Sequence, residues 1–147
     1  MNRRWVWVAR PGEVAAGENT AQEPRIPFLR AGEWTCNPAT RRGDLALLHQ
    51  PDAGITHLLA VRSDPYPVGT PFREFDDSPV CCYRTLQRFT RPVGLDALRD
   101  DPALAAWAAL RQDAARRHAP VPDRVWNSLL HRLGVGDRHL LAPATVA

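Results

Sequence analysis

Residues 32–50, GEWTCNPATRRGDLALLHQ, change character halfway along. Gly43 and Asp44 form a turn, and the apolar run at 45–48 that follows has the length of a buried strand. The first half has Gly, Pro and Arg neighbours that indicate a loop, in which Trp34 has no automatic burial. The stretch therefore predicts a loop that presents an aromatic side chain, followed by a strand over residues 44–49.

Apolar residues predict further strands on both sides of this stretch. In RWVWVAR (4–10) the two Trp residues point one way and the two Val residues the other, so this strand has two apolar faces and is buried. A Pro-Asp-Ala-Gly turn at 51–54 joins the strand at 44–49 to ITHLLAVRSD (55–64) as a hairpin. VCCYRTLQRFTRPV (80–93) forms a long strand, and residues 11–31 form a long connection.

The pattern becomes helical from Gly94 onward. One stripe at helical spacing contains Leu104, Trp107, Ala108 and Leu110, and Asp101 with Pro102 forms the start of this helix. A second helix starts near Pro122 and Asp123 and ends at Gly134, with Val125, Trp126, Leu129, Leu130 and Leu133 on its apolar side. We expect residues 134–147 to be a frayed tail. Strands followed by helices predict one α+β domain over residues 1–147, a small curled sheet flanked by helices.

The cysteines and the N-terminus indicate a compartment. The three cysteines are an odd number, and Cys81 and Cys82 are adjacent, so reduced thiols fit better than a disulfide framework. The first apolar run ends at Ala9, which is short of a signal peptide, and no other run reaches membrane-spanning length. We therefore expect a soluble cytoplasmic protein without a membrane partner.

The charge permits contact with nucleic acid without requiring it. The chain has 147 residues, a formal charge of +3 and a pI near 9.1, and all nineteen of its basic residues are Arg. The planar fork of Arg suits phosphates and guanine edges. A composition bias explains the lack of Lys more simply than selection at each site.

Familiar catalytic and metal-binding signatures are absent from the sequence. It has no Gly-rich phosphate loop, no His-Glu-x-x-His and no nucleophile elbow. Five residues with suitable donors lack metal-ligand spacing: Cys36, Cys81, Cys82, His49 and His57. A nucleophilic Cys36 paired with His57 would also need an oxyanion site, which the sequence does not reveal. We expect no metal and no cofactor.

Trp34 has neighbours that suit a binding site. Thr35 and Asn37 offer a hydroxyl and an amide, and an aromatic ring beside such groups suits a flat heterocycle. The alternative is that Trp34 closes the end of a barrel as a core residue. Core packing is the simpler interpretation for Trp107 and Trp126.

Four motifs occur in an order that resembles the EVE domains of the PUA-like superfamily. They are WTCNPATRRGDLALLHQ, AVRSDPYPV, CCYRTLQRFTRPVGLDALRDDPALAAWAALR and VPDRVWNSLLHRL, and they cover about residues 32–133, with the aromatic first strand in addition. The resemblance implies a small curled β-barrel with peripheral helices, related in fold to PUA, ASCH and YTH domains. Several members are similar to readers of modified bases that hold a flipped nucleotide in an aromatic pocket, and many are fused to restriction nucleases in anti-phage systems.

Carried over by position, the resemblance implies a base-binding pocket. Trp34 would stack on the base, and Trp7 and Tyr83 would complete the cage. Polar contacts would come from Thr35, Cys36, Asn37, Ser63 and Asp64, and phosphate contacts from Arg41, Arg42, Arg62, Arg73 and Arg84. The chain reads VARPGE and WTCNPA where the best-known branch of the family has Ser-Glu-Pro and Trp-x-Gly-x-Arg-Asn.

The resemblance implies a non-enzymatic module that recognises a modified, for example methylated, nucleobase in DNA, with RNA as the less favoured polymer. A separate nuclease or other effector would be its protein partner in an anti-phage or restriction context. Two alternatives stay open: an ASCH-type hydrolase acting on a modified nucleoside, and a plain protein-interaction module.

Overall fold

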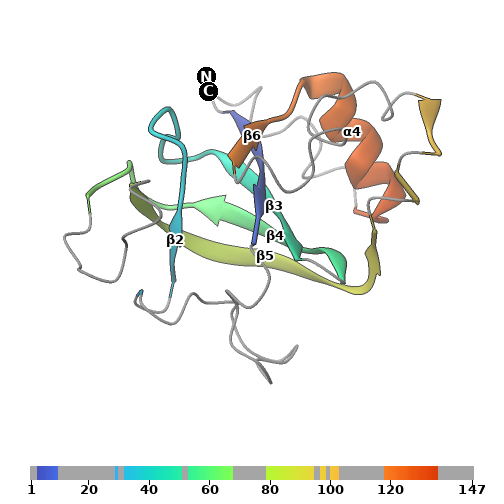
Figure 1. Cartoon of the computed structure of the whole chain (residues 1–147), viewed down its shortest axis with the longest axis horizontal. Coiled ribbons are helices and arrows are strands. Elements are labelled where there is room, and N and C mark those ends of the chain that lie inside the picture. Colours follow the sequence, from blue (N-terminus) through green and yellow to red (C-terminus); the bar gives the residue numbers. More distant parts are fainter. Residues whose placement is uncertain are drawn as a thin grey trace.

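The computed structural model describes residues 3–9, 29, 32–50, 53–67, 79–94, 97–98, 100–102 and 118–135. Six strands and one helix lie in these ranges (Figure 1). The strands are β1 (Arg4–Val8), β2 (Glu33–Thr35), β3 (Leu45–Gln50), β4 (Gly54–Val61), β5 (Val80–Val93) and β6 (His118–Pro120), and the helix is α4 (Asp123–Arg132). None of the helical residues in these ranges forms a segment that is long and apolar enough to cross a membrane.

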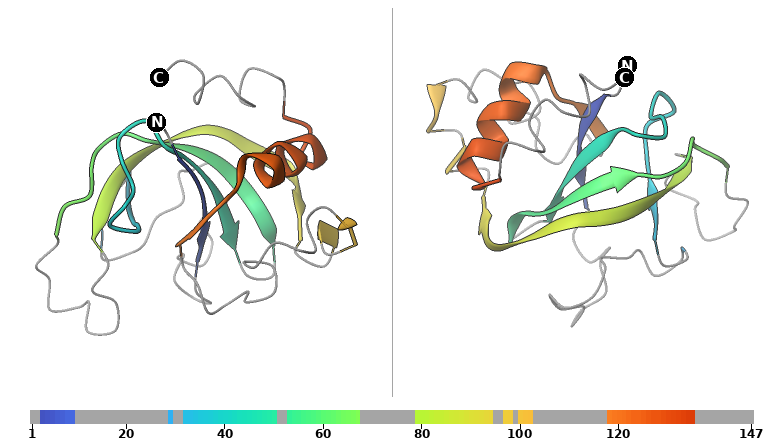
Figure 2. Two further views of the ribbon diagram at one scale, coloured as in Figure 1. Left: turned by 90° about the horizontal axis from the view of Figure 1, so that it is seen from above. Right: turned by 180° about the vertical axis from the view of Figure 1, so that it is seen from behind.

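The strands form one curled sheet in the order β2-β5-β4-β3-β1-β6 (Figure 2). β1 lies parallel to β3, with Trp5 opposite Ala46 and Trp7 opposite Leu48, and every other pair is antiparallel. β3 and β4 form the predicted hairpin, and β5 runs beside both β4 and β2. Segments far apart in the sequence thus meet in one sheet.

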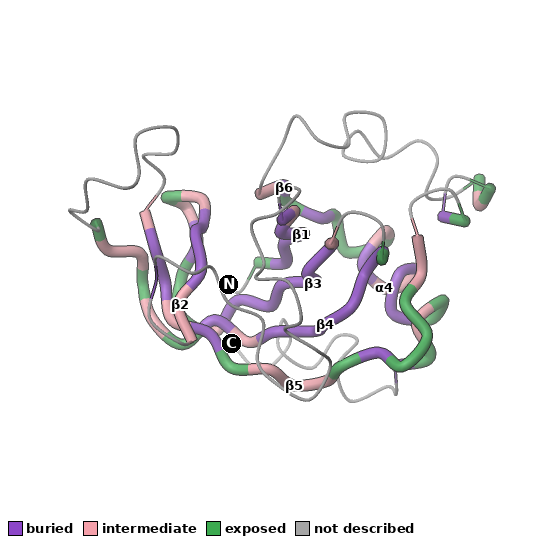
Figure 3. The backbone as a smooth tube through the Cα atoms, turned by 60° about the horizontal axis from the view of Figure 1, so that its bottom comes forward, coloured by how far each residue is buried: buried purple, intermediate pink, exposed green. Residues whose placement is uncertain are grey.

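Each face of the sheet has its own hydrophobic core. One, which we call the aromatic cluster, contains Trp5, Trp7, Ala9, Leu29, Trp34, Cys36, Ala46, Leu48, Leu59, Val61, Val80, Cys81 and Tyr83. The other, which we call the helix cluster, contains residues of β1, β3, β4 and β5 together with Trp126, Leu129 and Leu130 of α4. The central strands β1, β3 and β4 are buried along most of their length for this reason (Figure 3).

α4 is attached to the sheet by its apolar side and by one ion pair. Arg4 of β1, which is 4% exposed, donates from Nη1 to Asp123 Oδ1 at 2.7 Å, and its guanidinium lies 6.0 Å from the centroid of the Trp126 ring. Gly134 ends the helix with a φ of 73°, a value that suits glycine.

The structure confirms the strands and the second helix that the sequence predicts. β5 has the predicted bounds, β3 is shifted by one residue, and β4 ends at Val61, three residues earlier than expected. Trp5 and Trp7 lie in the aromatic cluster and Val6 in the helix cluster, as the alternation in β1 requires. The helix expected around Leu104, Trp107, Ala108 and Leu110 lies outside the described residues, as do residues 11–28.

Two expectations were wrong, and one strand was not anticipated. Residues 33–35 were expected in a loop but form β2, because their backbone pairs with the start of β5. β6 was not predicted at all, because three residues that include a proline carry no strand pattern. Val135 belongs to the helix cluster and donates its N–H to Leu130 O at 3.0 Å, so it is packed and not frayed. Residues 136–147 lie outside the described part of the chain.

Candidate nucleic-acid interface

Several of the predicted site residues lie at one end of the sheet, where β3 begins and β4 ends. Gly43 N donates to Val61 O at 2.9 Å, and Arg62 N donates to Cys82 O at 2.8 Å. These bonds hold the loop at 36–44 and the segment at 62–67 against the start of β5. Residues that are distant in sequence therefore share one end of the fold.

The aromatic residues expected to form a cage are buried together. Trp7 and Trp34 are both 0% exposed, and the Trp34 ring meets the Tyr83 ring edge to face with a centroid separation of 6.4 Å. Trp34 thus belongs to the core, which agrees with the alternative interpretation of Trp34 as a core residue. Its short strand turns the side chain inward, onto the same face as Cys81 and Tyr83 of β5.

Two of these aromatic rings carry an unused donor. Among the described residues, Nε1 of Trp7 and Nε1 of Trp34 are buried without a hydrogen-bond partner. Buried polar groups are usually satisfied, and an orphaned donor costs about 1–3 kcal/mol. Trp126 Nε1 in the helix cluster is also without a partner. An acceptor placed beside Trp7 and Trp34 would remove two of these penalties.

The three residues after Trp34 have structural partners. Thr35 Oγ1 lies 3.0 Å from Nε2 of His118, the thiol of Cys36 hydrogen-bonds with the thiol of Cys81, and Asn37 Oδ1 accepts from Ala39 N at 2.8 Å. Asn37 therefore caps a turn in the loop. The Thr35–His118 contact joins β2 to β6, which are the two edge strands of the sheet.

Ser63 and Asp64 also hold loops in place. Ser63 Oγ accepts from Cys82 N at 2.8 Å, and Asp64 Oδ1 accepts from Arg42 N at 2.9 Å. One oxygen of the Asp64 carboxylate is thereby fixed, while the side chain stays exposed.

A buried carboxylate organises the base of the loop. Asp44 is 0% exposed, and it accepts hydrogen bonds from Arg3 N at 2.7 Å, Arg41 N at 2.9 Å and Trp5 Nε1 at 2.9 Å. Three donors at these distances replace the water that burial removes. Asp44 therefore ties the loop that carries Arg41 to β1.

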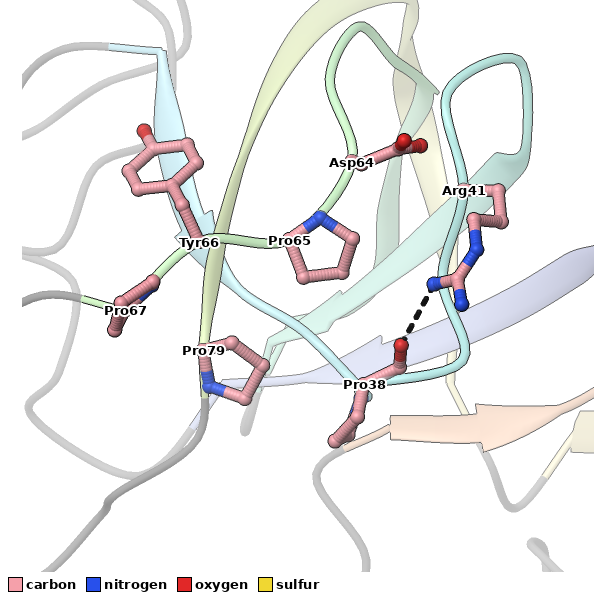
Figure 4. Close-up of a pocket in the computed structure, with 7 residues that line it drawn as sticks. All are labelled: Pro38, Arg41, Asp64, Pro65, Tyr66, Pro67 and Pro79. Carbon is pink, nitrogen blue, oxygen red and sulfur yellow. Dashed lines mark hydrogen bonds between the residues drawn. The ribbon is translucent and has the colours of Figure 1, made fainter.

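A pocket of about 500 Å³ opens beside this loop (Figure 4). Its walls are four proline rings and one tyrosine, with a cation and a carboxylate at one end: Pro38, Pro65, Pro67, Pro79, Tyr66, Arg41 and Asp64. Arg41 Nη1 donates to Pro38 O at 2.8 Å and to Thr40 O at 2.6 Å, which orients its guanidinium. Figure 4 shows Tyr66 and Pro67 at the end opposite Arg41.

The arginines expected to contact phosphate differ in their placement. Arg41, Arg42 and Arg62 are exposed at the same end of the sheet as the pocket. Arg84 is exposed as well, but it follows Tyr83 on β5 and pairs with Ala60, which packs against the helix cluster. The alternation of the strand thus turns Arg84 to the opposite face from Tyr83. Arg73 lies outside the described residues.

Tyr66 links the pocket to the edge of the sheet. Its hydroxyl donates to Glu33 Oε2 and lies 3.4 Å from Cys82 Sγ. Desolvation, followed by the contacts with Cys82 and Glu33, raises the pKa of Tyr66 well above its ordinary value. The hydroxyl therefore stays protonated and acts as a fixed donor at physiological pH.

The thiols and histidines in the described part of the chain are not clustered for metal binding. Cys36, Cys81 and Cys82 are free thiols, and no group of three metal-ligating side chains occurs in those ranges. Hydrogen bonding to Cys36 and burial raise the pKa of Cys81 far above its usual range, so this thiol stays protonated. His57 Nδ1 lies 2.7 Å from Thr56 Oγ1 of its own strand.

Sequence reasoning missed His118, Tyr66 and the depth at which Asp44 is buried. His118 had no signal, because its partner Thr35 is 83 residues away. Tyr66 lies in a stretch so rich in proline that no element could be assigned to it. The Gly-Asp turn did single out Asp44, but as a turn residue only.

A curled six-stranded sheet with a central parallel pair and a packed helix is the architecture of the PUA-like superfamily. Within it, the chain belongs to the EVE domain family, whose model matches residues 30–132. This confirms the resemblance carried by the four sequence motifs. A search of curated protein sequences finds no match.

Solved structures share this fold at low identity. A protein from Rhodopseudomonas palustris, determined by NMR, is 21% identical with a TM-score of 0.65, and the match covers 93% of this chain and 97% of that chain. A hypothetical protein from Leishmania major is 14% identical with a TM-score of 0.68, covering 91% and 96%. Human THYN1, solved in complex with DNA containing 5-methylcytosine, is 12% identical with a TM-score of 0.65, covering 92% and 99%.

Proposed function

We propose that this EVE domain is a non-enzymatic binding module that recognises a modified nucleobase in DNA. A flipped base occupies the aromatic cluster beside Trp34, and the exposed arginines at the same end of the sheet contact the phosphates. The human protein of the same fold, bound to DNA with 5-methylcytosine, supports this class of ligand. RNA is the alternative polymer, and a separate effector protein is the partner we propose for a restriction or anti-phage role in the cytoplasm.

The observation that carries the proposal is the pair of buried indole N–H groups in one aromatic cluster. Nε1 of Trp7 and Nε1 of Trp34 have no acceptor among the described residues. Nucleobases are flat rings with carbonyl oxygens and ring nitrogens on their edges, so one ligand supplies both a stacking surface and the missing acceptors.

The energetics require contacts outside the aromatic cluster. Extruding a base costs a few kcal/mol, and stacking on an aromatic ring returns about 1–3 kcal/mol per base. The net affinity must then come largely from phosphate contacts, for which Arg41, Arg42 and Arg62 are placed and exposed. Binding of this kind weakens as salt rises, because condensed counterions are released from the nucleic acid.

Access to Trp34 requires the loop at its C-terminal side to move. Trp34 has no exposed surface, and the chain that follows it is held by the bond from Cys36 N to Pro79 O at 2.9 Å. Residues 36–41 therefore act as the entrance of the base-binding site. Asp64, the acid that a hydrolase would use, is engaged with Arg42 N on this entrance.

The test is a fluorescence polarisation titration at low and moderate salt. Duplex and single-stranded oligonucleotides carry cytosine, 5-methylcytosine, 5-hydroxymethylcytosine or N6-methyladenine at one position. We expect the wild-type protein to prefer one modified oligonucleotide, and the preference to be lost in Trp34→Phe and Trp7→Phe. Phe keeps most of the ring but removes the indole N–H.

Trp126→Phe is the matched control, because it makes the same chemical change at a buried, unpartnered indole in the helix cluster. It should retain the preference. Salt-sensitive binding without a preference for any modified base would show that the arginines act only as a basic surface. That result would contradict the proposal. Release of a hydrolysed product from a nucleoside panel, lost in Asp64→Asn, would favour the ASCH-type hydrolase instead.

A further inference from the structure

The pocket lined by prolines, Tyr66, Arg41 and Asp64 lies outside the aromatic cluster but adjoins it. Its lining does not include Trp7, Trp34 or Tyr83. Pro38 directly follows Asn37, and Pro79 accepts the hydrogen bond from Cys36 N at 2.9 Å. The pocket thus shares the entrance loop with the site proposed for the flipped base, and a nucleotide held in one would have its neighbour beside the other.

From this arrangement we infer a second subsite, which takes the base adjacent to the flipped one and favours guanine. The inference rests on the proposed function, since the adjacent base belongs to the same nucleic-acid strand. The volume of about 500 Å³ falls in the range of small-ligand pockets. The occupant is identified by the shape of the walls and by the chemistry of the polar end.

The walls suit the face of a flat ring. Four of the seven lining residues are prolines, whose rings are rigid and present apolar surface without a backbone N–H. Tyr66 is held in place by the contacts of its hydroxyl with Glu33 and Cys82, and by the backbone bonds between Tyr66 and Val80 at 2.8 and 2.9 Å. A base would lie in an open concavity whose walls are already in place, so binding does not have to order them.

Arg41 and Asp64, a donor and an acceptor, both line the polar end of the pocket. The carbonyls of Pro38 and Thr40 use only Nη1 of Arg41, so Nε and Nη2 carry N–H groups that these carbonyls do not use. Arg42 N uses only Oδ1 of Asp64, which leaves Oδ2 beside the pocket. Between these two described side chains there is no ion pair within 4.0 Å. Both groups are therefore available to a ligand.

A carboxylate at this place favours a base over a phosphate. Asp64 would repel a phosphate but accepts hydrogen bonds from amino and imino groups on a base edge. Guanine matches both groups best, because O6 and N7 accept from an Arg fork while its N1–H and N2–H₂ donate to a carboxylate. Adenine and inosine each retain only part of this pattern.

The subsite is tested with single-stranded oligonucleotides, in which guanine N1–H and N2–H₂ are not paired with cytosine. Each carries the modified base that the wild-type protein prefers in the first titration, and its neighbours are guanine, inosine, adenine, thymine or an abasic site. A matched set carries the unmodified parent base. Wild-type protein should bind the guanine-flanked oligonucleotide about tenfold more tightly than the adenine-flanked one, with inosine between them. The abasic neighbour should bind more weakly than guanine because the pocket stays empty.

Asp64→Asn is the decisive variant. Its remaining oxygen can still accept from Arg42 N, so the loop is retained, but an amide NH₂ replaces the free carboxylate oxygen. We expect the guanine preference to disappear. Asp100→Asn, at another exposed acid, is the control and should leave both preferences unchanged.

The second subsite and the proposed function are contradicted by different results. Equal binding to all flanking bases, or a guanine preference that persists in Asp64→Asn, would overturn the second subsite even where the modified base is still preferred. Equal binding to the modified and unmodified sets would instead overturn the proposed function, whatever the flanking base does.

Discussion

The indole N–H of Trp5 and the carboxylate of Asp44 meet inside the protein, with Nε1 and Oδ2 separated by 2.9 Å. The same carboxylate receives the backbone N–H groups of Arg3 and Arg41. Asp44 thus connects the first strand, the start of β3 and the loop beside the pocket. A single side chain fixes the geometry on which the candidate interface depends.

Replacing Asp44 by Asn should destabilise the fold. The amide keeps one acceptor oxygen but turns an NH₂ group toward N–H donors, so at least one charge-assisted bond is lost and one donor is left unpaired. We expect a loss of about 3 kcal/mol in the free energy of unfolding. For a domain of this size that corresponds to about 6–12 °C in Tm. Thermal unfolding followed by circular dichroism measures the change, and an Asn variant as stable as Asp100→Asn would contradict it.

Gly54 at the end of the β3–β4 turn should not tolerate a side chain. Its φ is +102°, and a Cβ there would lie 2.5 Å from the carbonyl oxygen of Val93. Strain in this backbone region alone costs about 1–3 kcal/mol, and the clash with backbone atoms adds to it. Gly54→Ala should therefore lower the urea midpoint strongly.

Gly94 is the matched control position for the Gly54→Ala substitution. A Cβ at Gly94 meets nothing within 4 Å. Gly94→Ala should leave the urea midpoint close to that of the parent protein. Equal midpoints for the two alanine variants would show that the close approach of Gly54 to β5 is not maintained in solution.

The stability should fall in mildly alkaline solution because of Cys81. Its hydrogen bond with Cys36 and its burial keep the folded thiol protonated, whereas an unfolded cysteine ionises near a pKa of about 8.5. Above that pH the unfolded state binds fewer protons than the folded state, so the free energy of unfolding decreases as pH rises. One such group contributes a slope of about 1.4 kcal/mol per pH unit.

Urea unfolding between pH 7 and pH 9.5 tests this dependence. Cys81→Ala should give a shallower decline than the parent protein over that range. Tyr66, whose pKa is also raised, adds a further loss only above about pH 10, where unfolded tyrosine ionises. The same slope in Cys81→Ala and the parent would show that Cys81 is not the group responsible.

Thr35 and His118 should be energetically coupled. Thr35 Oγ1 and His118 Nε2 are 3.0 Å apart, Thr35 is buried and His118 half-buried, and the contact joins the two edge strands. A double-mutant cycle with Thr35→Val and His118→Ala should give a coupling of about 1 kcal/mol, the usual net value of one hydrogen bond. Additive effects of the two substitutions would mean that the contact contributes nothing to stability.

The strands and α4 could be predicted because their signals are local. Alternation in β1, the apolar run of β3 and the β-branched and aromatic residues of β5 each depend on neighbouring residues only. β2 could not be predicted, since its three residues become a strand only by pairing with Val80, Cys81 and Cys82, which lie more than forty positions away. β6 is equally short and depends on β1 in the same way.

Sequence reasoning grouped the right segments but not their contacts. The segments at 34–37 and 63–64 meet at one end of the sheet, where both contact the start of β5. Whether Trp34 faces water or the core depends on the register in which β2 pairs with β5, which sets Trp34 opposite Cys81, and no local pattern contains that information. The structural roles of Ser63, Asp64 and Asn37 are likewise set by partners across the sheet or around a turn.

The shortness of β2 and β6 affects how copies of this protein behave at high concentration. An exposed sheet edge is a template on which a strand of another molecule can add and start aggregation. Here β2 and β6 are each three residues long, β6 ends in Pro120, and the two strands are joined to each other through Thr35 and His118. These two strands therefore offer little backbone for pairing with a second molecule.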